Sequence, residues 1–75
     1  MQTMTSPGDV LNRHMQRKGY NQVQFAALTG HDNTTVNKII KDNRRPSIEL
    51  FSEMTYYLGP VFALEYLEAM NDDEA

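Results

Sequence analysis

The amino-acid sequence predicts a small all-α domain of five short helices. Capping residues and helix-ending glycines or prolines recur along the chain, and the apolar residues between them repeat at helical spacing. No convincing strand lies between these segments. With 75 residues, 40% of them hydrophobic, the chain can build one core but cannot also enclose a deep ligand cavity. The sequence therefore fits a single packed module.

The first helix is expected to begin at Pro7 and to end near Lys18. Ser6 is a favourable N-cap, proline suits the first helical position, and Gly19 can end the helix. One side of this segment carries its apolar residues, which are Val10, Leu11 and Met15.

A tight turn separates the second and third expected helices. Asn21 and Gln24 have the spacing of a capping box at the start of the second helix, and an apolar run follows them. Gly30 can adopt a positive φ in the turn, after which Asp32 or Asn33 caps the third helix. The third helix, residues 33–41, is expected to bury the side formed by Val36, Ile39 and Ile40.

Gly59 and Pro60 separate the fourth and fifth expected helices. Ser47 caps the fourth helix, whose apolar residues repeat at helical spacing as far as Leu58. The fifth helix spans residues 61–70 and is apolar around more of its circumference than one buried stripe requires. We therefore expect one of its faces to contact a second chain.

Charge is distributed unevenly along the chain, although the net charge is only −3. Residues 1–48 hold all seven basic residues and three acidic ones, a net charge of +4, whereas residues 49–75 hold seven acidic residues and no basic one. An anionic polymer that approaches the N-terminal part would therefore meet a positive surface. The alternative is a chance asymmetry of the kind that many protein surfaces carry.

The composition excludes several classes of protein. Without cysteine, the chain has no disulfide, no thiolate nucleophile and no cysteine-based zinc site. The longest apolar runs, residues 25–28 and 61–64, are shorter than the ~20 residues of a membrane span or the ~7 of a signal-peptide core. We expect a soluble, cytoplasmic protein.

The second and third segments together have the features of a helix-turn-helix, in which a small residue, here Ala26, lets two helices cross closely. Residues 22–41 read QVQFAALTGHDNTTVNKIIK and resemble the motif of the Cro and XRE-type repressor family. The resemblance extends over roughly residues 7–67 and implies a compact five-helix, lambda-repressor-like DNA-binding fold. The opening residues 7–11 are also similar to the start of HigA-like antitoxins in the same superfamily.

Two residues depart from the family pattern. Thr29 stands where the family usually places an aliphatic side chain, and His31 follows the turn glycine where an aliphatic residue is common. We expect Thr29 to bury its methyl group and to donate its hydroxyl to a backbone carbonyl one turn back. The motif then persists at a modest cost in stability.

The polar edge of the third helix is the expected DNA-reading surface, because a major groove ~12 Å wide admits one α-helix. Asparagine can pair with adenine, lysine with guanine, and a threonine methyl can contact thymine. The residues expected to face base edges are Asn33, Thr34, Asn37 and Lys38, and the resemblance implies base contacts at Asn33, Thr34 and Lys38. The residues expected to bind phosphates are Gln22, Lys41, Asn43, Arg44 and Arg45. The alternative is that both groups are ordinary solvated surface.

The helix-turn-helix domain is expected to cover residues 6–70, between a flexible N-terminus at residues 1–5 and an acidic disordered tail at residues 71–75. Its expected function is that of a transcriptional repressor. A homodimer would bind a roughly palindromic DNA operator, with one copy of the third helix in each of two successive major grooves.

Two lines of apolar residues on the fifth helix are candidates for the dimer interface. One line is Phe62, Tyr66 and Met70, and the other is Val61, Leu64 and Leu67. We name Phe62, Tyr66 and Met70 as the interface, so a charge introduced at Phe62 or Tyr66 is expected to weaken dimerisation, and operator binding with it.

No enzymatic activity, cofactor or metal is expected. His14 and His31 lie in separate segments without a carboxylate at ligand spacing, and the caps Ser6 and Ser47 have no histidine and aspartate pair around them. One alternative function is an antitoxin that neutralises a toxin through its acidic half and binds DNA only to regulate its own operon. A second alternative is a protein-only interaction module, which the departures from the motif favour.

Overall fold

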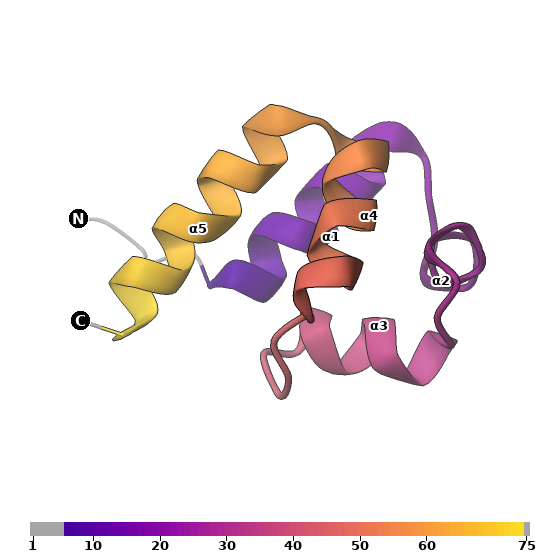
Figure 1. The fold of residues 1–75 in the computed structure, drawn as a ribbon, viewed down its shortest axis with the longest axis horizontal. Helices are drawn as coiled ribbons and strands as arrows, with labels where there is room; N and C mark the ends of the chain where they lie inside the picture. Colours follow the sequence, from indigo (N-terminus) through magenta and orange to yellow (C-terminus); the bar gives the residue numbers. More distant parts are fainter. Residues whose placement is uncertain (1–5, 75) are drawn as a thin grey trace.

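The computed structural model describes residues 6–74, which form five helices (Figure 1). They are α1 (Pro7–Lys18), α2 (Gln22–Thr29), α3 (Asn33–Ile40), α4 (Ile48–Leu58) and α5 (Pro60–Glu74). The predicted all-α, five-helix fold is confirmed. The N-terminus that we expected to be flexible, residues 1–5, lies outside the described residues, as does the last residue of the expected tail.

Helix α5 is longer than the sequence predicts. The predicted helix ends at Met70 and is followed by a disordered acidic tail, whereas the backbone of α5 stays helical to Glu74. No glycine or proline follows Pro60, so the chain has no strong helix-ending residue after Met70. The expected start of a disordered tail at residue 71 is therefore corrected.

The predicted helix caps are present in the structure. The Oγ of Ser6 accepts the N–H of Asp9 at 3.1 Å, and the Oγ of Ser47 accepts the N–H of Leu50 at 3.1 Å. Asn21 and Gln24 form the predicted capping box, with distances of 2.8 and 3.0 Å. Each cap satisfies a backbone group that the helix leaves unpaired, which explains why these three helices begin where the sequence predicts.

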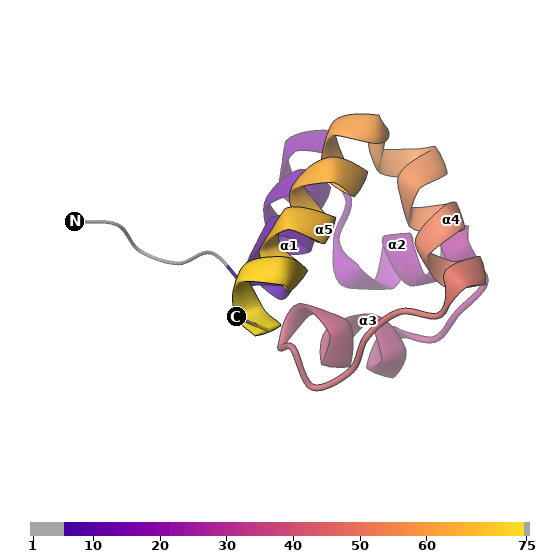
Figure 2. The ribbon, with the colours of Figure 1, turned by 60° about the vertical axis from the view of Figure 1, so that its left-hand side comes forward.

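Helices α1 and α5 lie side by side, and α4 packs against both of them (Figures 1 and 2). Helices α2 and α3 pack against each other at the other end of the domain, where α3 also contacts α1. Side chains from all five helices meet in one hydrophobic core, whose largest members include Leu11, Phe25, Ile39, Leu50 and Phe62.

The structure corrects the choice of dimer interface on α5. Phe62 and Tyr66 are both 0% exposed, and their rings pack with the ring of Phe51 at centroid distances between 5.4 and 5.9 Å. Met70 is partly buried against the same core. Phe62 and Tyr66 are covered by the chain's own α1 and α4, so they are not available to a second chain, whereas Met70 keeps part of its surface exposed. The exposed apolar residues of α5 are Val61, Leu64 and Leu67.

A histidine and a glutamate connect α1 to α5. The Nε2 of His14 lies 2.7 Å from Oε1 of Glu65, and the His14 ring meets the ring of Phe62 edge to face at 5.6 Å. His14 is buried, whereas Glu65 is half-buried and also lies 4.0 Å from a guanidinium nitrogen of Arg13. The hydrogen bond from His14 lowers the pKa of Glu65.

Candidate nucleic-acid interface

The turn between α2 and α3 brings two short helices into contact across buried small and branched residues. Ala26 on α2 and Val36 on α3 are 3% and 2% exposed and belong to the same core cluster. Gly30 adopts φ 76°, a left-handed conformation that ends α2, and the N–H of His31 donates to the Ala26 carbonyl at 2.9 Å. The predicted helix-turn-helix geometry is therefore present.

Thr29 fits the motif in the way that the sequence predicts. Its side chain is buried, and its hydroxyl donates to the carbonyl of Phe25 at 2.9 Å, with the carbonyl of Ala26 at 3.2 Å. Both carbonyls lie one turn back along α2, so the hydroxyl is satisfied without a partner outside the helix. The other departure from the pattern, His31, is exposed and takes no part in the core.

Helix α3 has one buried face and one exposed face. Val36 and Ile39 are buried, whereas Asn33, Thr34 and Lys38 are exposed. Three of the four residues that we expected to read bases are therefore open to a ligand. The arrangement follows from helical periodicity, because residues three or four positions apart share a face.

Asn37, the fourth expected base-reading residue, is only partly exposed and is held by α2. Its Nδ2 donates to Oε1 of Gln22 at 3.1 Å. Gln22 is the first residue of α2 and was expected to bind phosphate, so the structure joins one member of each expected group. Because this hydrogen bond uses the amide oxygen of Gln22, the Nε2 group of Gln22 is the part of its side chain that can donate to a ligand.

The four expected phosphate-binding residues of the loop after α3 are all exposed, and they are Lys41, Asn43, Arg44 and Arg45. The guanidinium of Arg44 donates to Oγ1 of Thr35 at 3.5 Å, which directs it back along α3. A guanidinium nitrogen of Arg45 lies 3.9 Å from Oδ1 of Asp42. The two arginines therefore have different partners, and Arg44 is the one that lies against α3.

Two residues around this surface were not among those expected from the sequence. Thr35 supports Arg44, and Asp42 pairs with Arg45. Asp32 appeared only as a possible cap, and its carboxylate accepts the N–H of Thr35 at 2.8 Å. The hydrogen bonds from Thr35 lower the pKa of Asp32, and the positive charge of Arg44 acts in the same direction. Asp32 therefore carries a negative charge at neutral pH at the start of α3, where it disfavours a phosphate.

Comparison with known protein families identifies the same helix-turn-helix. A family model described as helix-turn-helix matches residues 11–59, more than half of the chain, and this region extends from α1 to the end of α4. No match is found among curated proteins. Within residues 6–74, no helix has both the length and the apolar character that are needed to cross a membrane.

Proposed function

The chain belongs to the Cro/C1-type helix-turn-helix family of DNA-binding domains, a family without enzymatic activity, and from that premise we propose that it is an operator-binding transcriptional repressor. The observation that carries this proposal is the polar face of α3, where Asn33, Thr34 and Lys38 are exposed opposite a buried apolar face. An α-helix with such a face fits the major groove, where base edges present distinct donors and acceptors.

Each of the exposed side chains offers a specific chemistry for this task. The amide of Asn33 can pair bidentately with adenine, the ammonium of Lys38 can donate to guanine acceptors, and the methyl of Thr34 can contact thymine. In this proposal Asn37 contributes to the same surface through its hydrogen bond to Gln22. Base contacts of this kind specify the sequence, whereas contacts to the sugar-phosphate backbone set the register.

Phosphate binding is assigned to the N-terminal end of α2 and to the loop after α3. Gln22 stands at a positive helix end, and the loop carries Lys41, Arg44 and Arg45. If these three cations each neutralise one phosphate in both copies of a dimer, the logarithm of the binding constant should fall with the logarithm of salt concentration with a slope of roughly −5. A slope near zero would contradict the assignment.

We propose that the repressor acts as a homodimer. One helix-turn-helix makes few contacts, and a second copy makes the second half-site contact effectively intramolecular, which raises the affinity. The two half-sites should lie ~34 Å apart, one turn of the duplex, in a roughly palindromic operator.

Selection of bound sequences from random duplex DNA tests the proposal directly. The Lys38→Ala variant should lose preference at one base position of each half-site, whereas Arg44→Ala should weaken binding to all sequences about equally. Lys18→Ala, which removes an exposed cation on α1, is the matched control and should change neither property. Selection of the same sequences by wild type and Lys38→Ala would refute the role of α3 as the reader.

An antitoxin is the second candidate, and the acidic half of the chain favours it. All seven acidic residues of the segment 49–75 lie in or after α4, together with most of the exposed large apolar residues. A basic toxin could bind both the negative charge and the exposed apolar surface of this half. In that case Lys38→Ala would relax the preference for the operator as above and leave toxin neutralisation intact in a growth assay.

A further inference from the structure

We propose that two copies of this chain dock through the groove between α4 and α5, with Ile48 of each copy seated in the groove of the other. The inference rests on the proposed homodimer and specifies the surface that forms it. It differs from a simple pairing of α5 against α5, because the contact is centred on the first residue of α4.

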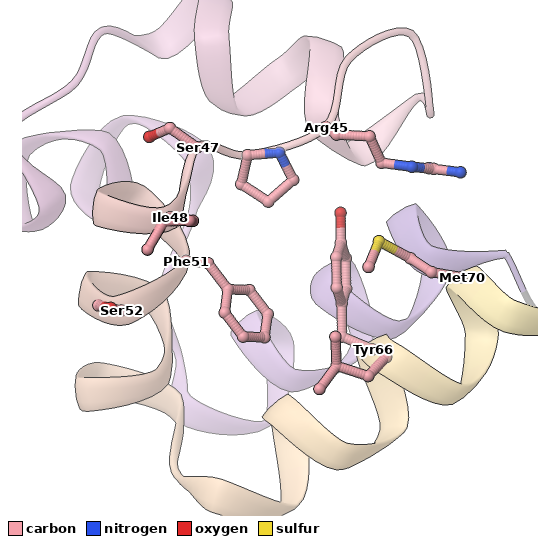
Figure 3. A pocket seen from close by; sticks show the side chains of 9 residues that line it. Arg45, Ser47, Ile48, Phe51, Ser52, Tyr66 and Met70 are labelled. Carbon is pink, nitrogen blue, oxygen red and sulfur yellow. The ribbon is translucent and has the colours of Figure 1, made fainter.

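The groove lies between the first turns of α4 and the later turns of α5, and the loop before α4 closes one end (Figure 3). Its volume is about 360 Å³. Its walls are mainly apolar and include Phe51, Leu67 and Met70, each of which keeps some exposed surface. A hollow of this kind on so small a domain offers a site for one large aliphatic side chain.

Ile48 projects from the rim of the same groove. It is 87% exposed, the highest value among the exposed large apolar residues of the described chain, although its neighbour Phe51, three residues later, is mostly covered. The apolar side chain of Ile48 is left in water, which is unfavourable, and it packs against little of its own domain. It therefore acts as a projection beside a hollow.

A second copy fits this face because the projection and the hollow lie on the same surface. Two-fold pairing uses one surface patch twice, so the projection of each copy can enter the hollow of the other. The exposed residues Leu64 and Leu67, which are 64% and 45% exposed, extend the apolar surface along α5 from the groove. The two-fold contact would cover them as well.

Charge favours the groove over a direct contact between two α5 helices. Segment 49–75 has no basic residue, so α5 packed on α5 would bring Glu68 of the two copies together without a positive partner. Docking of Ile48 instead carries the adjacent Glu49 to the rim of the groove, near the positively charged loop of the other copy. This attraction between opposite charges would act twice in the dimer.

The location also suits the proposed DNA complex. The loop that closes the groove follows directly after α3, so a contact at the groove fixes the separation of the two α3 helices. Neither Ile48 nor Leu67 belongs to the proposed DNA-binding surface. Substitutions at these residues therefore affect the dimer without removing a contact to DNA.

The absence of native cysteine allows the geometry to be tested by disulfide trapping. Chains carrying Ile48→Cys and chains carrying Leu67→Cys are mixed and oxidised in buffer. We expect the mixed disulfide between the two variants to exceed both homodisulfides, because Ile48 of one copy lies against Leu67 of the other. Val23→Cys, at a residue of α2 that is 64% exposed, is the matched control and should form only background levels of dimer.

A second measurement uses sedimentation equilibrium. Ile48→Asp should raise the dimer dissociation constant by about tenfold or more, whereas Val23→Asp should leave it unchanged. Circular dichroism melting curves show whether each variant is folded. A predominant homodisulfide at Leu64→Cys, or a wild-type chain that is monomeric at millimolar concentration, would overturn the proposal.

The outcomes separate this inference from the proposed function. A monomeric chain that still selects a DNA sequence would refute the groove contact and leave DNA recognition standing. A dimer with the expected mixed disulfide that selects no sequence would support the groove contact and refute the repressor. A groove that binds only a different protein would also overturn the inference.

Discussion

The backbone N–H of Gly8 donates a hydrogen bond to Oδ1 of Asp42 at 2.8 Å, across 34 residues of sequence. Asp42 lies just after α3 and adopts φ 63°, and its carboxylate satisfies a free N–H in the first turn of α1. The two backbones come so close that a Cβ on Gly8 would lie 1.9 Å from the carbonyl oxygen of Ile40. The end of α3 is therefore fixed on the start of α1.

Replacement of Asp42 should show how much this contact stabilises the domain. Asp42→Ala removes the acceptor of the Gly8 N–H. Alanine also tolerates a positive φ less well than aspartate, because it has no polar side chain to form a local hydrogen bond. We therefore expect a loss of about 1–3 kcal/mol in the free energy of unfolding. Asp42→Asn keeps an acceptor and tolerates the same φ, and it should lose less. Urea unfolding of both variants gives the comparison, and equal losses would show that the acceptor does not matter.

The acidic limb of the stability profile should depend on Glu65. Its pKa in the folded chain lies below the usual value of 4.5, chiefly because of the hydrogen bond from His14. The unfolded chain therefore takes up a proton at Glu65 at higher pH than the folded chain does, so the contribution of this pair is present above pH 4.5 and is lost as the pH falls through the lowered pKa. Glu65→Gln should reduce this fall in stability.

The measurement is the free energy of unfolding of wild type and Glu65→Gln at a series of pH values from neutral to acid. The difference between the two proteins isolates Glu65, since Asp32 also has a lowered pKa and contributes to both profiles in the same way. The difference should be largest at neutral pH and should shrink towards acid pH. A constant difference would mean that the carboxylate does not respond to folding.

Tyr66 supplies a test at alkaline pH. Its hydroxyl is buried without a hydrogen-bond partner among the described residues, and burial raises its pKa to about 12. The unfolded chain ionises this phenol near pH 10, so stability should fall as the pH rises from there towards 12. Tyr66→Phe should be about 0.5–1.5 kcal/mol more stable than wild type at pH 7, because no unpaired hydroxyl is buried.

Chemical unfolding at neutral and alkaline pH measures both effects. Tyr56→Phe is the matched control, since Tyr56 is 80% exposed, and it should follow the wild-type profile. A Tyr66→Phe variant that is less stable than wild type would indicate that the hydroxyl has a partner that matters.

The features that the sequence predicts well are those that depend on neighbours along the chain. Ser6, Asn21 and Ser47 cap helices because their side chains reach N–H groups only three residues ahead. The hydroxyl of Thr29 likewise finds its carbonyls within one helical turn. Such contacts are fixed by local geometry, so the order of residues is sufficient to predict them.

Contacts between segments that are far apart in the sequence could not be predicted from it. Both apolar lines of α5 have helical spacing, and only the packing of α1 and α4 decides that Phe62 is buried while Leu64 is exposed. The pairs His14 with Glu65 and Gly8 with Asp42 join residues 51 and 34 positions apart. No periodicity signals such partners, because they depend on how whole helices are placed in three dimensions.

The hydrogen bond between Gln22 and Asn37 predicts that these residues act on DNA as one unit. Because Nδ2 of Asn37 holds Oε1 of Gln22, Asn37 orients the free amide nitrogen of Gln22, which is the group available to a phosphate. Gln22→Ala and Asn37→Ala should each weaken binding to a selected operator by about two- to tenfold. The double variant should be little worse than either single one, with a coupling energy of about 0.5–1 kcal/mol.

Titration of labelled operator DNA at fixed salt concentration measures this coupling, and binding to operators with single base changes measures specificity. If Asn37 acts through Gln22, Asn37→Ala should weaken binding to every operator by the same factor, because phosphate contacts carry no base preference. Lys38→Ala is the comparison variant, since it should alter the preference at one position. A change of preference in Asn37→Ala that Gln22→Ala does not share would show that Asn37 contacts a base itself.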